Sequence, residues 1–337
     1  MTPILECVPN FSEGRDPDVI RAITDAVAEV PGAKVMHVDP GHGANRTVVT
    51  FAGAPAAVTE AAFRAIRRAG ELIDMTRHQG EHPRLGATDV CPLVPVSGIT
   101  LDETAELART LGERVGRELN LPVYLYEHAQ PNPARRNLAD IRAGEYEGLA
   151  AKILRPEWRP DSGPAAFDAR RGATVIGARD FLAAYNVNLD TPSRELAHEI
   201  ACDVRTSGRV IRDPGGAETR VPGTLRAAKA IGWYIPEYGR AQVSMNLTNL
   251  AVTPVHTAFE AVRHAAAARG VRVTGSELIG LLPLRSLLEA GRHFAEKADA
   301  EASEDRLLEI AVRGLGLDDL GPFDPKARVI ERLLGAT

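Results

Sequence analysis

The chain has 337 residues, of which 44% are hydrophobic and 25% are charged, and its formal net charge at pH 7 is -5. This composition is typical of a soluble globular protein, and the length allows about two domains or one large one. The net charge is too small to indicate a nucleic-acid partner, so an anionic ligand would have to meet a local patch of basic side chains.

The three cysteines, Cys7, Cys91 and Cys202, lie far apart and have no paired spacing. This disfavours a disulfide framework or a structural zinc site and favours a reducing compartment. The N-terminus has no basic segment before an apolar stretch, and no run approaches the roughly 18 apolar residues that a spanning helix needs. We therefore expect a cytoplasmic protein without a signal peptide or membrane anchor.

The first hundred residues alternate between strand-like and helical patterns of apolar residues. A helix is expected from Asp18, with Ile20, Ile23, Val27 and Val30 on one face. The other predicted elements are strands over 4–8, 35–38, 47–51 and 87–96 and a helix over 56–73. The order is βαββαβ, which is typical of a ferredoxin-like unit, where two helices cover one face of an antiparallel sheet.

A helix over 101–119 and a strand over 123–126 extend this unit. The segments 131–136 and 154–164 then carry the densest clusters of Pro, Gly, Asn and Asp in the chain, as domain boundaries often do. We place the junction just before Ala165, which divides the chain into domains 1–164 and 165–337.

The same order of elements recurs after the junction, although no repeat is visible at the level of residues. The expected elements are strands over 181–189, 227–235, 241–249 and 271–274, helices over 193–204 and 257–269, and a final helical stretch over 284–313. The sequence therefore predicts an α+β fold of two tandem ferredoxin-like subdomains. Junctions between such units favour small-molecule sites, so we expect a substrate cleft between them.

The loop between the helix over 56–73 and the strand over 87–96 is the main candidate for chemistry. It contains His78 and His82, and Gly80, Pro83 and Gly86 shape it. Histidine suits proton transfer because its reference pKa of about 6.5 lies near working pH. The alternative is a solvated loop with two incidental histidines. We predict no metal site, because Gly and Pro break the helix that would make the two histidines neighbours.

Other polar groups at strand ends could face the same cleft. In the first unit they are Asn10 and the Gly-rich segment 39–46, and in the second unit the segment 163–172 and the strand carrying Asn186 and Asn188. The two asparagines would present their amides side by side, because alternate strand residues share a face. Each has a simpler interpretation: Asp39-Pro-Gly as a hairpin turn, and Arg170-Arg171 as solvated charges.

Several longer blocks closely resemble glutamate formimidoyltransferase, the transferase half of formimidoyltransferase-cyclodeaminase, over nearly the whole chain. The blocks are 6–14, 45–47, 72–78, 80–84, 89–92, 141–146, 172–175 and 232–234. It looks like a monofunctional form, so we expect the chain not to deaminate its product by itself. The segment 208–223 looks longer than in the animal enzymes.

The resemblance implies transfer of a formimidoyl group from N-formimidoyl-L-glutamate to N5 of tetrahydrofolate, in histidine degradation, by a homodimer. His82 matches the family's catalytic histidine in its Gly-Glu-His-Pro-Arg block. Tetrahydrofolate is the implied co-substrate, and no metal is implied. The family's folate loop matches Gly163, Pro164, Ala165, Ala166, Phe167, Asp168, Ala169, Arg170, Arg171 and Gly172, with the paired arginines matching less well.

These expectations give roles to the remaining candidates. Asp39 is expected to orient or charge-balance the imidazole of His82, Arg84 or Arg46 to meet a substrate carboxylate, and Asn10 to bind substrate. Two alternatives stay open: a glutamate formyltransferase that uses N-formylglutamate, whose donor differs only by oxygen for NH, and a non-catalytic folate-binding module. The basic groups Arg170, Arg171 and Arg179 are expected to bind the glutamate tail of folate.

Overall fold

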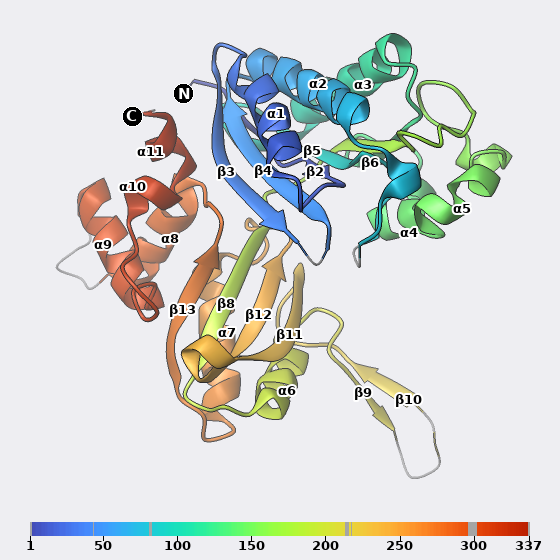
Figure 1. The fold of residues 1–337 in the computed structure, drawn as a ribbon. Helices are drawn as coiled ribbons and strands as arrows, with labels where there is room; N and C mark the ends of the chain where they lie inside the picture. Colours follow the sequence, from blue (N-terminus) through green and yellow to red (C-terminus); the bar gives the residue numbers. More distant parts are fainter. Residues whose placement is uncertain are drawn as a thin grey trace. The chain divides into compact units, whose positions relative to one another are not determined.

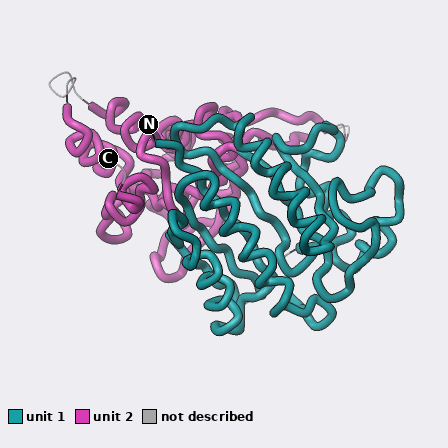
Figure 2. The backbone as a smooth tube through the Cα atoms, turned by 90° about the horizontal axis from the view of Figure 1, so that it is seen from above, with its two compact units in different colours: residues 1–179 teal, residues 180–337 magenta. Residues whose placement is uncertain are grey.

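The computed structural model of the chain describes residues 2–42, 44–80, 83–212, 216, 218–295 and 302–335. The fold is of the α+β class, and the chain divides into two compact units, Met1–Arg179 and Asp180–Thr337 (Figure 2). The division therefore follows Arg179, whereas the sequence analysis placed it before Ala165. The segment 165–179 belongs to the first unit.

The reason is a short strand that the sequence analysis missed. The strand β7 (Thr174–Ala178) pairs in parallel with β5 (Thr88–Ser97) and β6 (Val123–Glu127). All five of its residues are buried. The turn-rich segment 154–164 is thus a connection inside the first unit, because the chain must return from it to complete the sheet.

The sheet of the first unit has the strand order β3-β4-β1/β2-β5-β7-β6. Its remaining strands are β1 (Ile4–Cys7), β2 (Asn10–Phe11), β3 (Ala33–Gly41) and β4 (Arg46–Gly53). The pairings of β1 to β5 with one another are antiparallel. This confirms the predicted order βαββαβ over the first hundred residues.

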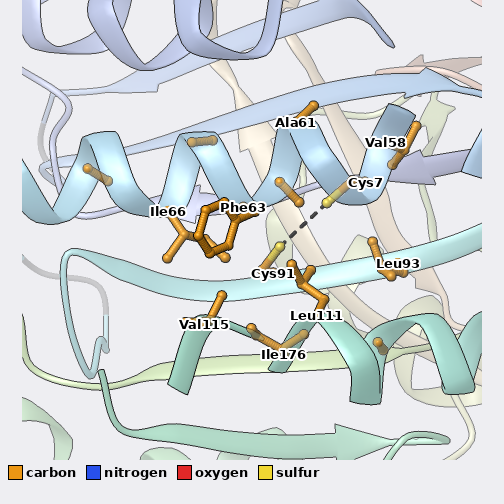
Figure 3. Close-up of a cluster of buried hydrophobic side chains, with 14 of the residues drawn as sticks. Cys7, Val58, Ala61, Phe63, Ile66, Cys91, Leu93, Leu111, Val115 and Ile176 are labelled. Atoms are coloured by element: carbon orange, nitrogen blue, oxygen red, sulfur yellow. Dashed lines mark hydrogen bonds between the residues drawn. The ribbon is translucent and has the colours of Figure 1, made fainter. Parts of the chain in front are cut away.

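Three helices pack on one face of this sheet: α1 (Pro17–Ala28), α2 (Pro55–Leu72) and α3 (Leu101–Glu118) (Figure 1). Thr100 and Glu103 form a reciprocal capping box that starts α3. The core beneath the helices includes Cys7 and Cys91, whose sulfur atoms lie 3.5 Å apart (Figure 3). Burial raises the pKa of the Cys7 thiol, so it stays protonated inside the core.

Two short helices that the sequence analysis did not predict pack near β5, β6 and β7. They are α4 (Leu138–Arg142) and α5 (Glu145–Lys152). Ile141 of α4 and Leu149 of α5 pack with Val90 and Val175 in a second hydrophobic core. Along β5 and β7, Val90 and Val175 alternate with Cys91 and Ile176 of the first core. These two helices therefore cover the face opposite α1, α2 and α3.

The second unit has a four-stranded antiparallel sheet in the order β11-β12-β8-β13. Its elements are β8 (Ala183–Leu189), α6 (Arg194–Val204), β11 (Ala228–Ile235), β12 (Arg240–Leu247), α7 (Val255–Ala267) and β13 (Val273–Ile279). The predicted order βαββαβ is confirmed here too. The last strand extends further than the predicted 271–274.

Additional elements decorate the second unit. A separate hairpin, β9 (Arg209–Arg212) and β10 (Glu218–Val221), interrupts the connection from α6 to β11. The predicted helical stretch 284–313 contains two helices, and residues 296–301 between them lie outside the described residues. The closing helices are α8 (Leu284–Phe294), α9 (Glu304–Leu315), α10 (Pro325–Arg328) and α11 (Ile330–Leu334).

Single 3-10 turns are η1 (Met75–Arg77), η2 (Pro133–Arg135), η3 (Pro156–Trp158) and η4 (Pro236–Tyr238). Among the described residues, no helix combines the length and apolar character needed to cross a membrane.

Candidate active site

Three loops of the first unit are joined by Asn45, which lies in the turn between β3 and β4. Its side chain accepts a hydrogen bond from the backbone N–H of Gly14 (3.0 Å) and donates to the carbonyl of Gln79 (2.9 Å). Asn45 is buried and has a φ of 47°, a left-handed conformation that Asn tolerates better than most residues. A side chain at Gly80 would place its Cβ 2.2 Å from the carbonyl oxygen of Ala44. The loops after β2, between β3 and β4, and before β5 are therefore closely packed.

His78 is held at both ring nitrogens. Its Nε2 lies 2.8 Å from the carbonyl oxygen of Asn45, and its Nδ1 lies 3.3 Å from Nε of Arg84. A carbonyl can only accept and a guanidinium can only donate, so the imidazole carries its proton on Nε2 and is neutral. Burial lowers its pKa, and the nearby cation Arg84 acts in the same direction.

Arg84 ties this loop to α5. Its guanidinium donates two hydrogen bonds to the carboxylate of Glu147 (2.9 and 2.6 Å) and one to Glu145 (3.1 Å). The Arg84 side chain is 9% exposed, whereas those of Glu145 and Glu147 are 43% and 63% exposed. The carboxylate of Glu147 raises the pKa of Arg84. The guanidinium of Arg84 is thus occupied by the two carboxylates of α5. Arg84 can meet a substrate carboxylate, as expected from the sequence, only if these contacts open.

A second ion pair of opposite polarity fixes the end of the same loop. Asp89, at the start of β5, is fully buried and forms a salt bridge with Arg142 of α4. The same carboxylate accepts a hydrogen bond from the backbone N–H of Leu85 (3.0 Å). The loop is therefore attached to α4 and α5 by a cation on one side and a carboxylate on the other.

His82 and its neighbour Glu81 lie outside the described residues, so the expected role of His82 stays a prediction. A pocket of about 450 Å³ is lined by described residues that precede and follow these two in the sequence and by residues at the start of α5: Gln79, Gly80, Arg84, Gly144, Glu145 and Glu147. Its polar walls suit a hydrophilic ligand. Among the described residues, no group of three or more His, Cys, Asp or Glu side chains is arranged to hold a metal ion.

The structure brings Asn10 and Arg46 together. Asn10 is buried on β2, and its side-chain oxygen accepts a hydrogen bond from Arg46 at the start of β4. Burial lowers the pKa of Arg46 to about 10, which still leaves the guanidinium charged at neutral pH. Asp39 lies on β3 opposite Val48, which on its other side is opposite Asn10. The exposed Asp39 is thus two strands away from Asn10, about 10 Å in a sheet.

The segment Gly163–Gly172 belongs to the first unit, although the sequence analysis assigned it to the second. Its last residue pairs with Gly86, and the flanking backbone groups complete the bridge: Ala87 N–H donates to the carbonyl of Arg171 (2.9 Å) and Ala173 N–H to that of Leu85 (3.1 Å). A Cβ at Gly172 would lie 2.1 Å from the carbonyl oxygen of Leu85, and its φ of 71° also favours glycine. The segment is therefore joined directly to the His82 loop.

Its two arginines differ in their surroundings. Arg171 forms an ion pair with Asp168 (2.6 Å) and donates to the carbonyls of Leu119 and Asn120 (2.8 and 3.2 Å), at the C-terminal end of α3. Arg170 is exposed and donates to the carbonyl of Glu71 (3.0 Å). Arg171 is therefore engaged at a helix end, where a positive charge is favourable, and its expected part in a common cationic cluster stays a prediction.

In the second unit, the predicted side-by-side amides of Asn186 and Asn188 are confirmed on β8. Both are buried, and they donate to different carboxylates, Glu277 (3.1 Å) and Asp319 (2.9 Å). Glu277 also accepts hydrogen bonds from Gln242 and Tyr238, each at 3.1 Å. The face of β8, β12 and β13 that carries these residues is a connected hydrogen-bond network.

Sequence reasoning missed Glu145, Glu147 and Arg142 as members of the site. Glu145 and Glu147 lie 61 and 63 residues from Arg84, so no local pattern pairs them. The signal that could have found these two residues is the need of a buried arginine for carboxylate partners. An Arg in a loop leading into a buried strand needs a carboxylate partner, and 145–147 offers two carboxylates two residues apart.

Known proteins resemble this chain along both units. Residues 4–179 match the family defined as the N-terminal subdomain of the formiminotransferase domain, and residues 184–335 match the family defined as the formiminotransferase domain. The formimidoyltransferase-cyclodeaminase of Sus scrofa is 48% identical over 335 residues, which cover 99% of this chain and 60% of that protein. This chain thus spans about three fifths of the length of that relative.

Shorter relatives match over almost their whole length. The glutamate formimidoyltransferase of Streptococcus pyogenes serotype M1 is 40% identical over 299 residues, or 89% of this chain and 95% of that protein. The glutamate formimidoyltransferase of Thermoplasma acidophilum is 42% identical over 297 residues, or 87% and 92%. Family matches in both units and these relatives agree with one another, and the chain belongs to the formiminotransferase family.

Proposed function

We propose that this protein is a glutamate formimidoyltransferase, which transfers the formimidoyl group of N-formimidoyl-L-glutamate to N5 of tetrahydrofolate and releases L-glutamate. The proposal rests on the relatives named glutamate formimidoyltransferase, which this chain matches over nearly their whole length. In this chain, hydrogen bonds of Asn45 with His78 and Gln79 hold the loop that carries position 82 against the turn between β3 and β4. Tetrahydrofolate is the co-substrate and carries the one-carbon unit away. The placement of this reaction in histidine degradation is part of the proposal.

The reaction needs a group that moves protons near neutral pH. N5 is an amine that attacks the formamidine carbon, so a proton leaves the attacking nitrogen and another reaches the departing α-amine of glutamate. One imidazole can perform both steps in turn, a contribution typically worth about 10²–10⁴-fold in rate. His82 takes this role, and Asp39 orients it or balances its charge. His78 is less suited to it, because both of its ring nitrogens are already engaged.

Substrate binding is proposed for the other residues of the site. Arg46 or Arg84 meets a donor carboxylate, and for Arg84 this requires its contacts with Glu147 and Glu145 to open. Asn10 holds Arg46 in place. The segment Gly163–Gly172 binds the folate. We further propose that both units are ferredoxin-like, since each sheet has the order fourth-first-third-second strand of its βαββαβ segment.

Two other functions make distinct predictions. A glutamate formyltransferase would use N-formylglutamate instead, and a non-catalytic folate-binding module would bind tetrahydrofolate without releasing glutamate. The test is glutamate release from each donor with tetrahydrofolate, for the wild type and for His82→Ala. We expect release from the formimidoyl donor only, and turnover lower by at least about 10²-fold in the variant with folate binding retained. Wild-type turnover in His82→Ala would remove His82 from the mechanism.

We propose a cytoplasmic homodimer as the working form. The absence of paired cysteines in the sequence agrees with a reducing compartment. Sedimentation at working concentration should give a species of twice 36.2 kDa. A single 36.2 kDa species would contradict the dimer.

A further inference from the structure

Consecutive side chains at the start of α5 contact two different parts of the site. Glu145 and Glu147 bind Arg84 in the His82 loop. Tyr146, between them, donates a hydrogen bond to the carbonyl of Ala169 (2.5 Å), and its ring lies 5.5 Å from that of Phe167. Both partners of Tyr146 are in the segment Gly163–Gly172, for which we propose folate binding. One helical turn therefore touches both loops.

The contacts continue beyond Arg84 to the turn between β3 and β4. The Tyr146 ring centroid lies 5.9 Å from the Arg84 guanidinium, which donates to His78, and His78 in turn donates to the carbonyl of Asn45. Gly80 and Arg84 lie on either side of position 82 in the sequence, each two residues away from it. A continuous series of contacts thus leads from Ala169 to the flanks of His82.

The two loops also share a fixed end, at the backbone bridge between Gly86 and Gly172. A change in the segment Gly163–Gly172 can therefore reach the His82 loop by the backbone, near Gly86, or by Tyr146, near Arg84. The Tyr146 route is the one that ends at the charged groups. The phenol has an apolar neighbour in Phe167, and burial raises its pKa, so it remains a hydrogen-bond donor at neutral pH.

We propose that Tyr146 is a positioning residue for the transfer reaction: it couples the folate-binding segment to the loop that carries His82. This inference rests on the proposed function. Tyr146 acts through its contacts with Ala169, Phe167 and Arg84. It holds Ala169 against α5, so that a bound folate and the Arg84 flank of the catalytic loop share one rigid support. Catalysis is sensitive to such placement, because a displacement of about 1 Å can cost about 10²-fold in rate.

The test compares Tyr146→Phe with Tyr124→Phe. Each change removes one phenol hydroxyl that donates to a backbone carbonyl, but Tyr124 donates to Trp158 (2.8 Å) in the second core. Tyr146→Phe should lower kcat about tenfold, with the KM for tetrahydrofolate changed less than about twofold. Tyr124→Phe should leave kcat within about twofold. An unchanged kcat in Tyr146→Phe, or a change confined to KM, would overturn the coupling.

A double-mutant cycle with Glu147→Gln adds a readout that simple loss of stability does not give. If Tyr146 acts through Arg84, the two changes remove one shared coupling, so the double variant should lose far less than the product of the two single losses in kcat. Multiplying losses would show two independent effects and would refute the proposal.

Binding of 5-formyltetrahydrofolate, measured by titration, checks that each variant folds and still binds folate. A wild type that releases glutamate from neither donor would contradict the proposed function itself. An active wild type with unaffected Tyr146→Phe would contradict only the coupling.

Discussion

The two units share one order of strands and helices but keep their polar side chains in different places. In the first unit several of them lie at or beside the ends of strands, and two ion pairs attach the loop before β5 to α5 and α4: Arg84 with Glu147 and Asp89 with Arg142. In the second unit they lie on the strands themselves, where Asn186 is directly opposite Glu277. A loop can adjust to a reacting group, whereas strand register fixes a side chain before any ligand arrives.

This difference leads us to expect different roles for the polar groups of the two units. Preorganised amides and carboxylates on a sheet are suited to binding and support, because their geometry is set by backbone pairing. Groups that take part in proton transfer sit better in a loop that is fixed by a few strong contacts. We therefore expect variants of the loop contacts to affect kcat and variants of the sheet network to affect stability or KM.

The largest effect is expected from Arg84→Met. The change removes a nearly buried cation, and with it the contacts to Glu147, Glu145 and His78. Loss of a buried charged hydrogen-bond partner should cost about 2–3 kcal/mol in the free energy of unfolding, and kcat should fall about 10²-fold because the His82 loop loses its support. Urea unfolding and steady-state kinetics measure the two quantities.

The matched control is Arg21→Met, which removes an exposed guanidinium paired to Asp18 on α1. Exposed ion pairs contribute about 0–1 kcal/mol, so this variant should be close to the wild type in stability and kcat. If both variants behaved alike, the loop contacts would have no special role.

A smaller effect is expected from Glu277→Ala in the second unit. The change leaves the amides of Asn186 and Gln242 and the hydroxyl of Tyr238 without their shared acceptor. Unsatisfied polar groups of this kind should cost about 1–3 kcal/mol in the free energy of unfolding, while kcat falls less than in Arg84→Met. A fall in kcat as large as that of Arg84→Met, without loss of stability, would show that the sheet face takes part in the reaction.

The sequence predicted the long elements well and the short ones poorly. The helices α2 and α3 have 18 residues each, enough for the apolar period to identify them. The missed elements β7 and α5 have five and eight residues, and their conformation depends on partners far along the chain. The junction was misplaced for the same reason, because only the pairing of β7 with β5 shows that the chain returns to the first sheet.

The candidate site shows the same limit. Local sequence predicted a functional role for the loop that carries His78, His82 and Arg84, and the resemblance to a family implied a catalytic role for His82 and folate binding by Gly163–Gly172. The sequence did not reveal that Arg84 binds Glu147, or that Arg171 donates to a carbonyl at the end of α3, because both partners are distant in sequence. Residue types predicted the chemistry, and tertiary contacts decided which charges remain available to a ligand.

The pH dependence of the free energy of unfolding shows whether the fold holds the imidazole of His78 in its neutral form. Burial lowers its folded-state pKa below the ordinary value of 6.5, so the unfolded chain takes up a proton at a higher pH than the folded protein does. The contribution of His78 to stability is therefore complete above pH 6.5 and is lost as the pH falls from there through the lower folded-state pKa.

We expect His78→Gln to reduce this loss. Glutamine can donate to Asn45 and accept from Arg84 but does not titrate. The free energy of unfolding should therefore fall less between pH 7.5 and pH 5 in the variant than in the wild type. Other titrating groups, including His256, are present in both proteins and cancel in the difference. Parallel curves would mean that His78 is not held neutral by the fold.

The smallest expected effect separates Arg170 from Arg171. The glutamate tail of folate is anionic, and the exposed Arg170 is the arginine of this pair whose charge faces solvent. Arg170→Gln should raise the KM for polyglutamylated tetrahydrofolate about two- to fivefold, more than that for the monoglutamate, and added salt should produce the same change in the wild type. Arg171→Gln should instead lower the melting temperature with little change in KM, because its guanidinium is bonded to Asp168 and to the carbonyls at the end of α3. Equal KM values for the wild type and Arg170→Gln with both folates at low salt would show that Arg170 is only a solvated charge. A loss of folate affinity in Arg171→Gln without any loss of stability would support the cluster that the sequence suggested.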